Sequence, residues 1–163
     1  MRKYVLDTNI YIDAIRDPDN EQALATFLER NTPMTYMSAV VVQELRAGVF
    51  TDTQARALQD GIFSAFERRG RIAAPSPGAF KECGRILAAL FRHDGVPCRE
   101  RPRSLVNDIL IAITCRENGF TLITADDDFK TIRLHLRGFA YVPPWPRAVQ
   151  TRRSERVSRP RPT

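Results

Sequence analysis

The sequence predicts an α/β protein with a mainly parallel β-sheet that is covered by helices on both faces. Short apolar runs alternate with longer segments of helical periodicity along most of the 163 residues. Helix-capping residues, glycines and prolines mark most of the boundaries between these segments. Strands that alternate with helices pair in parallel, because each helix returns the chain to the same end of the sheet.

Five short segments are predicted to be strands. Each of them is apolar or aromatic, and each is bounded by residues suited to turns or helix caps. A parallel sheet of this kind binds its ligands just beyond the carboxyl ends of the strands. In chain order, the predicted strands cover residues 3–6, 34–37, 71–74, 120–124 and 139–142.

Seven segments have the periodicity of helices. A turn over residues 17–20 separates the first two, Ser38 caps the third, and Gly119 and Gly138 end the last two. The polar segment 94–104 contains two prolines and is predicted to be a loop or mobile lid. In chain order, the predicted helices cover residues 9–15, 21–30, 39–49, 53–69, 77–91, 105–117 and 128–137.

Composition excludes several classes of protein. No apolar run approaches the ~20 residues of a membrane-spanning helix, and the chain reaches Asp7 without a signal-peptide apolar region. The three cysteines form no C-x-x-C pair and have no zinc-finger spacing. These features exclude a membrane protein, a disulfide scaffold and a zinc finger. They predict a cytoplasmic protein with free thiols.

The net charge of +6 is concentrated at one end of the chain. Residues 147–163 contain six arginines and one glutamate, a net charge of +5. We therefore predict a folded domain over residues 1–143 and a basic, disordered tail over residues 144–163. Such a tail either binds nucleic-acid phosphates without sequence preference or is a solvated extension with no specific role, which is the commoner case.

Four acidic residues stand in unexpected places. Asp7 and Asp126 each follow a predicted strand, where an aspartate is also a favoured helix cap. Glu44 and Asp108 lie among apolar residues of predicted helices. A carboxylate on a buried helix face is rare unless it is paired, hydrogen-bonded or bound to a cation. For Asp108, a buried salt bridge to a distant arginine is the alternative.

Together, these acids predict a carboxylate cluster at the strand ends. Carboxylates that lie close together repel one another, so at least one of them retains a proton unless a cation is bound. Mg²⁺ and Mn²⁺ prefer oxygen ligands, and these motifs contain no histidine or cysteine to favour zinc. An acidic pocket on a basic protein therefore indicates a phosphate-bearing substrate held through a metal ion.

The segments that carry the acids resemble the PIN-domain family, and within it the VapC-type toxin ribonucleases of bacterial toxin–antitoxin systems. The resemblance covers about residues 2–143, and all four acids fall in the family's order. Its most specific marks are the L-D-T-N sequence at residues 6–9 and the T-x-D-x-D-F sequence at residues 124–129. Residues 107–112, N-D-I-L-I-A, add a third match.

This resemblance implies a three-layer α/β/α sandwich, an Mg²⁺- or Mn²⁺-dependent endoribonuclease activity, a homodimer and a cognate antitoxin protein. The loop 95–104 and the arginine tail are not part of the shared core. Two sets of residues are implied. The catalytic and metal-binding set is Asp7, Glu44, Asp108 and Asp126, and the supporting set is Asn9, Thr124 and Asp128.

The mechanism expected from these residues is hydrolysis by water. Asp7, Asp108 and Asp126 would bind the metal, and Glu44 would bind it or orient the attacking water. Attack by the RNA 2′-hydroxyl is not expected, because the two histidines, at 93 and 135, lie outside every motif.

Other functions are weaker or less specific. A phosphotransferase with an aspartyl nucleophile would have a second aspartate where this chain has Asn9. A receiver domain would need a lysine near the end of the domain, and Lys130, which lies on a predicted helix, is a poor match for it. A non-catalytic nucleic-acid or partner-binding module on the same fold stays open. The aromatic residues Tyr11, Tyr36 and Trp145 are predicted to pack rather than to stack on bases.

Overall fold

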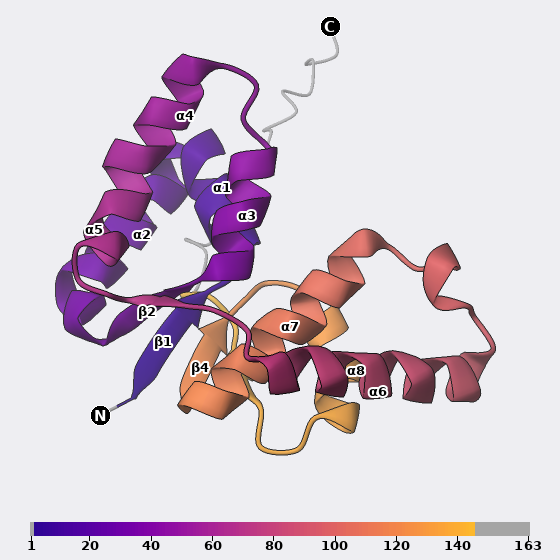
Figure 1. Ribbon diagram of the computed structural model, residues 1–163. Coiled ribbons are helices and arrows are strands. Elements are labelled where there is room, and N and C mark those ends of the chain that lie inside the picture. The colour runs from indigo at the N-terminus through magenta and orange to yellow at the C-terminus, as the bar shows by residue number, and fades with distance from the viewer. Residues whose placement is uncertain (1, 146–163) are drawn as a thin grey trace, which may run out of the picture.

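The computed structural model describes residues 2–145, which form an all-parallel five-stranded sheet between two layers of helices (Figure 1). The predicted α/β/α fold class is confirmed. The strand order in the sheet is β3-β2-β1-β4-β5. The strands are β1 (Lys3–Leu6), β2 (Thr35–Ser38), β3 (Ile72–Ala73), β4 (Phe120–Ile123) and β5 (Ala140–Val142).

The helices divide into two groups along the chain, and Figure 1 shows the first group on one side of the sheet and the second on the other. Short 3₁₀ turns at Thr32–Met34 and Cys98–Glu100 connect some of the elements. The first group is α1 (Thr8–Arg16), α2 (Pro18–Asn31), α3 (Ala39–Ala47), α4 (Asp52–Leu58) and α5 (Ser64–Glu67). The second group is α6 (Pro77–Asp94), α7 (Arg103–Asn118) and α8 (Asp128–His135).

The order of the strands reverses between β1 and β4. From β1 the chain builds outward to β2 and β3, and it then crosses back to place β4 on the other side of β1. In open α/β sheets, the crevice beyond the strand ends at such a reversal is where ligands bind. The register pairs Leu6 with Ile123, so the two strands end level and the residues that follow them emerge side by side.

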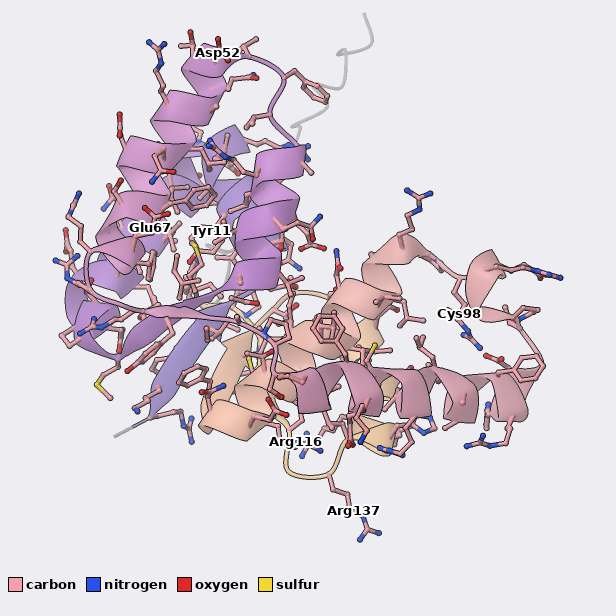
Figure 2. All side chains as sticks on the ribbon, in the orientation of Figure 1. Tyr11, Asp52, Glu67, Cys98, Arg116 and Arg137 are labelled. Atoms are coloured by element: carbon pink, nitrogen blue, oxygen red, sulfur yellow. The ribbon has the colours of Figure 1, made fainter. Side chains whose placement is uncertain are left out.

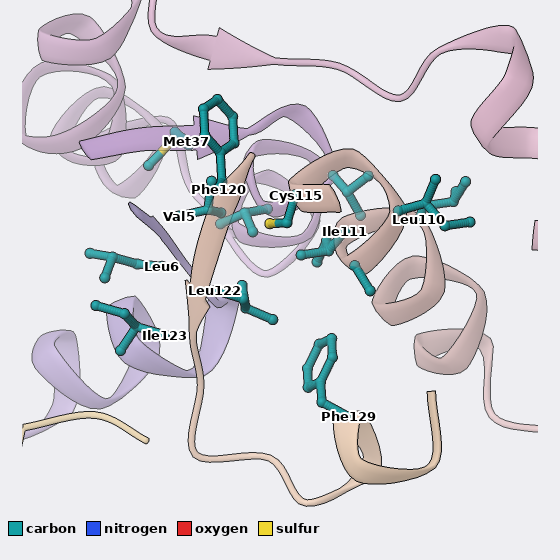
Figure 3. Close-up of a cluster of buried hydrophobic side chains, with 14 of the residues drawn as sticks. Val5, Leu6, Met37, Leu110, Ile111, Cys115, Phe120, Leu122, Ile123 and Phe129 are labelled. Carbon is teal, nitrogen blue, oxygen red and sulfur yellow. The ribbon is translucent and has the colours of Figure 1, made fainter. Parts of the chain in front are cut away.

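The core is built around the two central strands and α7. All four residues of β4 are buried, as are the eight consecutive α7 residues from Asp108 to Cys115. Figure 3 shows Leu122 directed toward α7 and Phe129 of α8, whereas Ile123 points to the opposite face of the sheet. This alternation of side chains along β4 supplies apolar surface to both helical layers.

Several predicted boundaries are wrong by a few residues, and one predicted turn is wrong. Residues 17–20 do not form a separate turn, because Asp17 caps α2 by accepting a hydrogen bond from the Asp19 amide at 2.9 Å. Pro18 takes the first helical position, where its missing amide hydrogen costs no hydrogen bond. The start of α2 could not be predicted from the sequence, because Asp17 and Pro18 suit both a turn and a helix start.

The helix predicted over residues 53–69 is interrupted by a π-helical turn at Gln59–Phe63, which separates α4 from α5. The predicted loop 94–104 is shorter than expected, because α6 continues to Asp94 and α7 starts at Arg103. An ion pair of 2.5 Å between Asp94 and Arg101 closes this loop on itself. This ion pair therefore links the end of α6 to a residue just before α7.

The predicted tail, residues 144–163, lies outside the described residues from position 146 onward. Within the described part, the Trp145 ring packs on Phe27 with a centroid distance of 5.2 Å. The Tyr36 ring stacks on Phe120 at 4.6 Å, and Tyr11 is buried, so all three aromatic residues pack as predicted. Between residues 2 and 145 no helix has both the length and the apolar character needed to cross a membrane.

Candidate active site

Asp7 lies where β1 ends and α1 begins, at the reversal of strand order. Its backbone amide donates to the Ile123 carbonyl at 2.9 Å, which continues the pairing of β1 with β4 by one residue. One carboxylate oxygen accepts from the Thr8 amide at 2.8 Å and caps α1. The other oxygen accepts from the Thr124 hydroxyl at 2.7 Å. Asp7 is therefore a helix cap, as its position after a strand allowed. It is also part of a hydrogen-bond network that includes Thr124.

The surroundings of Asp7 change its acidity. Its side chain is only 5% exposed. Burial raises the pKa from 3.8 to about 6, against the hydrogen bonds from Thr124 and Thr8, which lower it. The negative charges of Glu44 and Asp126 raise the pKa further. Asp7 is thus partly protonated near neutral pH unless a cation compensates for its burial.

Glu44 reaches the same place from α3. One of its carboxylate oxygens accepts from the Asn107 side-chain amide at 2.8 Å, and the other accepts from the Thr8 hydroxyl. Both donors are neutral. Among the described residues, no lysine or arginine forms an ion pair with Glu44.

Asp108 lies on α7 and is 8% exposed. Burial raises its pKa to about 8, and the charges of Asp7, Asp126, Glu44 and Asp128 raise it in the same direction. No side chain between residues 2 and 145 forms an ion pair or hydrogen bond with this carboxyl group, so the buried salt bridge considered from the sequence is not found there. Arg116, which Figure 2 labels, lies near the other end of α7. It pairs with Glu82 instead, at 3.3 Å.

Asp126 follows β4 and is linked to Asp7 through Thr124. The Thr124 hydroxyl accepts from the Asp126 amide at 3.0 Å while it donates to Asp7. The Asp126 carboxylate in turn accepts from the Asp128 amide at 2.8 Å, which opens α8. The T-x-D-x-D spacing thus places one hydroxyl and one carboxylate at the end of β4.

These residues line one open hollow of about 420 Å³, here called the acid hollow. Asp7, Glu44, Asp108 and Asp126 come from four separate segments of the chain, and the fold brings all of them to this hollow. Thr124 and Asp128 contact its acids through hydrogen bonds. The complete lining is Asp7, Thr8, Asn9, Ile12, Gln43, Glu44, Ala47, Ser104, Asp108 and Asp126.

The donor set of the acid hollow fits an oxygen-preferring divalent cation. Its titratable side chains are all carboxyl groups, and the Asn9 side-chain oxygen is buried without a partner among the described residues. Within residues 2–145, no three carboxyl, imidazole or thiol groups are gathered tightly enough to enclose an ion. Mg²⁺ commonly binds through one or two carboxylates together with substrate phosphates, so an open arrangement suits it.

Two contacts of the acid hollow were missed from the sequence. Thr8 and Asn107 donate hydrogen bonds to Glu44, but the sequence motifs that contain them do not predict this contact. The feature that could have indicated it is that Thr8 follows Asp7 and Asn107 precedes Asp108 in the chain. Lys130, the candidate lysine of a receiver domain, pairs with Asp127 at 2.7 Å and does not line the acid hollow.

Solved structures of similar fold include complexes from three bacteria. DNA-bound VapBC from Salmonella typhimurium shares 22% identity with a TM-score of 0.64, and the match covers 88% of this chain and 98% of that chain. FitAcB from Neisseria gonorrhoeae shares 23% identity with a TM-score of 0.62, covering 87% and 98%. VapBC2 from Rickettsia felis, bound to a promoter DNA fragment, shares 22% identity with a TM-score of 0.60, covering 88% and 98%.

These likenesses establish the fold. No curated protein sequence matches the chain. The family model of the PIN domain matches residues 4–134, a span that includes β4, all of β1 except Lys3, and all four acids of the hollow. The chain therefore belongs to the PIN-domain family.

Proposed function

We propose that this protein is an Mg²⁺- or Mn²⁺-dependent endoribonuclease that acts as the toxin of a toxin–antitoxin pair. The observation that carries the proposal is the acid hollow. Four carboxylates converge at the reversal of strand order, and none forms an ion pair with a basic side chain in the described part of the chain. Two of these carboxylates, Asp7 and Asp108, are buried, and buried carboxylates without a basic partner favour binding of a cation.

Asp7, Asp108 and Asp126 are the residues proposed to hold the metal, with Glu44 as a further ligand or as the acceptor that orients a water molecule. A bound divalent cation would neutralise charge on the scissile phosphate and acidify water. Asp108 is the carboxylate free to turn toward a ligand, because no described side chain contacts it by a hydrogen bond or ion pair. Asp7, Glu44 and Asp126 are each held by hydrogen bonds.

The remaining side chains of the hollow support these roles. Thr124 orients the Asp7 carboxylate and holds the Asp126 backbone amide, and Asn9 approaches the Thr124 hydroxyl with its side-chain amide at 3.5 Å. Because the hollow is open to solvent, it suits an exposed phosphodiester better than a fully enclosed small molecule. RNA in the cytoplasm is the substrate proposed for it.

Cleavage of a mixed RNA pool tests this function. The purified chain is incubated with Mg²⁺ or Mn²⁺, with chelator, and as the Asp126→Asn variant. The matched control is Asp127→Asn, because Asp127 belongs to the same triplet but is exposed and does not line the hollow. We expect cleavage by the wild type and by Asp127→Asn, and none with chelator or with Asp126→Asn.

The ends of the products test the proposed attack by water. A 5′-phosphate end paired with a 3′-hydroxyl end supports it, whereas 2′,3′-cyclic phosphates, or 3′-phosphates formed by their hydrolysis, indicate attack by the ribose hydroxyl. Stoichiometric RNA binding without turnover, unchanged by chelator, would instead establish the non-catalytic binding module.

An antitoxin partner is proposed because the similar structures are VapBC and FitAB-type complexes. This chain offers a surface that suits a bound partner segment: a mainly apolar groove of about 390 Å³ between α1, α3 and α4, which Glu44 also lines. Ile15 and Ile62 line both this groove and a second hollow of about 340 Å³ beside α2 and α5. A homodimer is proposed as well, and its mass in solution tests it.

A further inference from the structure

Glu44 is held differently from the other acids of the hollow. Both of its carboxylate oxygens accept a hydrogen bond from a side chain, one from Asn107 at 2.8 Å and one from Thr8. Asp108 has no such donor among the described residues, and the Asp126 carboxylate accepts from a backbone amide, that of Asp128. Glu44 is therefore the acid whose orientation depends on other side chains alone.

The two donors reach Glu44 from opposite sides of the sheet. Thr8 starts α1, which packs against α3 in the same layer. Asn107 lies on α7, in the other layer, where α7 contacts α3 near the strand ends. The Asn107–Glu44 hydrogen bond thus joins the two helical layers at the edge of the acid hollow, between residues 63 positions apart.

The chemistry of the donors matters as much as their position. A carboxylate has about four lone-pair sites for hydrogen bonds or metal ions. Two are used by Thr8 and Asn107, so the others remain for a ligand in the hollow. Because an amide and a hydroxyl are neutral, they restrain Glu44 without cancelling its charge, as a lysine or arginine would do.

We propose that Asn107 is a positioning residue that holds the Glu44 carboxylate, together with Thr8, in the orientation needed at the acid hollow. The proposal rests on the proposed nuclease function for its catalytic consequence. Its structural part, the anchoring of Glu44, does not depend on that function and is tested without metal or RNA.

The anchoring is tested by thermal unfolding in chelator. Asn107→Ala is compared in two backgrounds, wild type and Glu44→Ala. We expect Asn107→Ala to lower the melting temperature in the wild type. In the Glu44→Ala background it should have little effect, because the Asn107–Glu44 hydrogen bond is already missing there. An equal loss in both backgrounds would mean that Asn107 acts only by local packing, and would overturn the proposal.

Asn118→Ala is the matched control. Asn118 lies at the other end of α7 and donates to the Thr114 carbonyl at 2.8 Å, so its truncation also removes one side-chain hydrogen bond. Its effect on the melting temperature is expected to be the same with and without Glu44. A background-dependent effect of Asn118→Ala would show that Glu44→Ala disturbs α7 as a whole, and the coupling at Asn107 would then not support anchoring.

The catalytic consequence is tested by RNA cleavage kinetics. Asn107→Ala and Thr8→Val each remove one donor to Glu44, and each is expected to lower kcat roughly ten-fold or more while KM for RNA stays within about two-fold. Asn118→Ala is expected to cleave at the wild-type rate. An unchanged kcat for Asn107→Ala would overturn the positioning role, whereas absence of cleavage by the wild type would contradict the proposed function and leave the melting experiment to decide the anchoring.

Discussion

The Thr124 hydroxyl donates a hydrogen bond of 2.7 Å to the Asp7 carboxylate, across 117 positions of sequence. The same hydroxyl accepts from the Asp126 backbone amide at 3.0 Å, so one side chain connects the ends of β1 and β4 by contacts with the Asp7 carboxylate and the Asp126 backbone. Thr124 is itself buried. The acid hollow therefore depends on the pairing of these two strands, and the Thr124–Asp7 hydrogen bond in turn stabilises that pairing.

Replacing Thr124 by valine is expected to destabilise the protein. Valine keeps the shape but removes the donor to Asp7, and the pKa of Asp7 then rises further because this hydrogen bond lowers it. A hydrogen bond to a charged group contributes about 1.5–3 kcal/mol, and each kcal/mol shifts the melting temperature of a domain of this size by about 2–4 °C. Thermal unfolding at pH 8 measures the loss.

Thr26→Val is the control for this substitution. Thr26 lies on α2, donates a hydrogen bond to the Gln22 carbonyl at 2.8 Å near the surface, and does not line the acid hollow. We expect its melting temperature to stay within about 1–2 °C of the wild type. Equal effects of the two substitutions would contradict a special role of the Thr124 hydroxyl.

The stability of the metal-free protein is expected to fall as the pH rises from about 4 to 8. The pKa of Asp7 is about 6 and that of Asp108 about 8 in the folded state, against an ordinary value of 3.8. Between these values the folded protein holds protons that the unfolded chain has released, so raising the pH favours unfolding. Melting temperatures in chelator, recorded across this range, measure the slope.

Saturating Mg²⁺ or Mn²⁺ should reduce this dependence on pH, because a bound cation replaces the protons that the carboxyl groups otherwise retain. The Asp7→Asn/Asp108→Asn double variant should show a weaker slope in chelator for the same reason. A slope that is equally steep in the double variant would assign the pH dependence to other groups.

Asp108→Asn is expected to abolish RNA cleavage and to leave the metal-free fold as stable as the wild type or more so. The carboxyl group it replaces is buried, makes no hydrogen bond with a described side chain and lies among like charges. For the stability of the fold, the loss of one repelling charge therefore outweighs the small change in side-chain shape. Melting in chelator at pH 8, beside the cleavage assay, checks both parts, and a large drop in melting temperature would reveal a structural role instead.

The alternation of strands and helices was sufficient to predict the fold class, and the positions of the acids were sufficient to predict that four carboxylates cluster at the strand ends. Asp108 was conspicuous because a carboxylate interrupts the apolar run of α7, and Asp7 and Asp126 because each follows an apolar strand. Local propensity could not place the start of α2, since Asp17 and Pro18 suit both a turn and a helix start.

The contacts made by Asn107 and Thr8 could not be predicted, because they depend on how α3 and α7 meet across the sheet. Nothing in the spacing of residues 44 and 107 indicates a hydrogen bond between them. The π-helical turn at Gln59–Phe63 could not be predicted either. Its apolar residues continue the helical period on both sides, so only the packed structure reveals the extra residue in the turn.

The last prediction concerns the proposed antitoxin. Ile15 lines the apolar groove between α1, α3 and α4, yet its side chain is 64% exposed, so Ile15→Lys should cost the fold little. A lysine there would place a charge in the apolar contact and weaken binding of the proposed antitoxin by roughly ten-fold or more. RNA cleavage should be unchanged, because Ile15 does not line the acid hollow.

Leu134→Lys is the matched control, since Leu134 is also an exposed apolar residue near a helix C-terminus, 81% exposed on α8. Isothermal titration of each variant with the purified partner compares the two surfaces. Weakened binding by Ile15→Lys alone places the partner in the groove. If Leu134→Lys is the weaker binder and Ile15→Lys binds as the wild type does, the partner docks on the α8 side, and the groove between α1, α3 and α4 has another occupant.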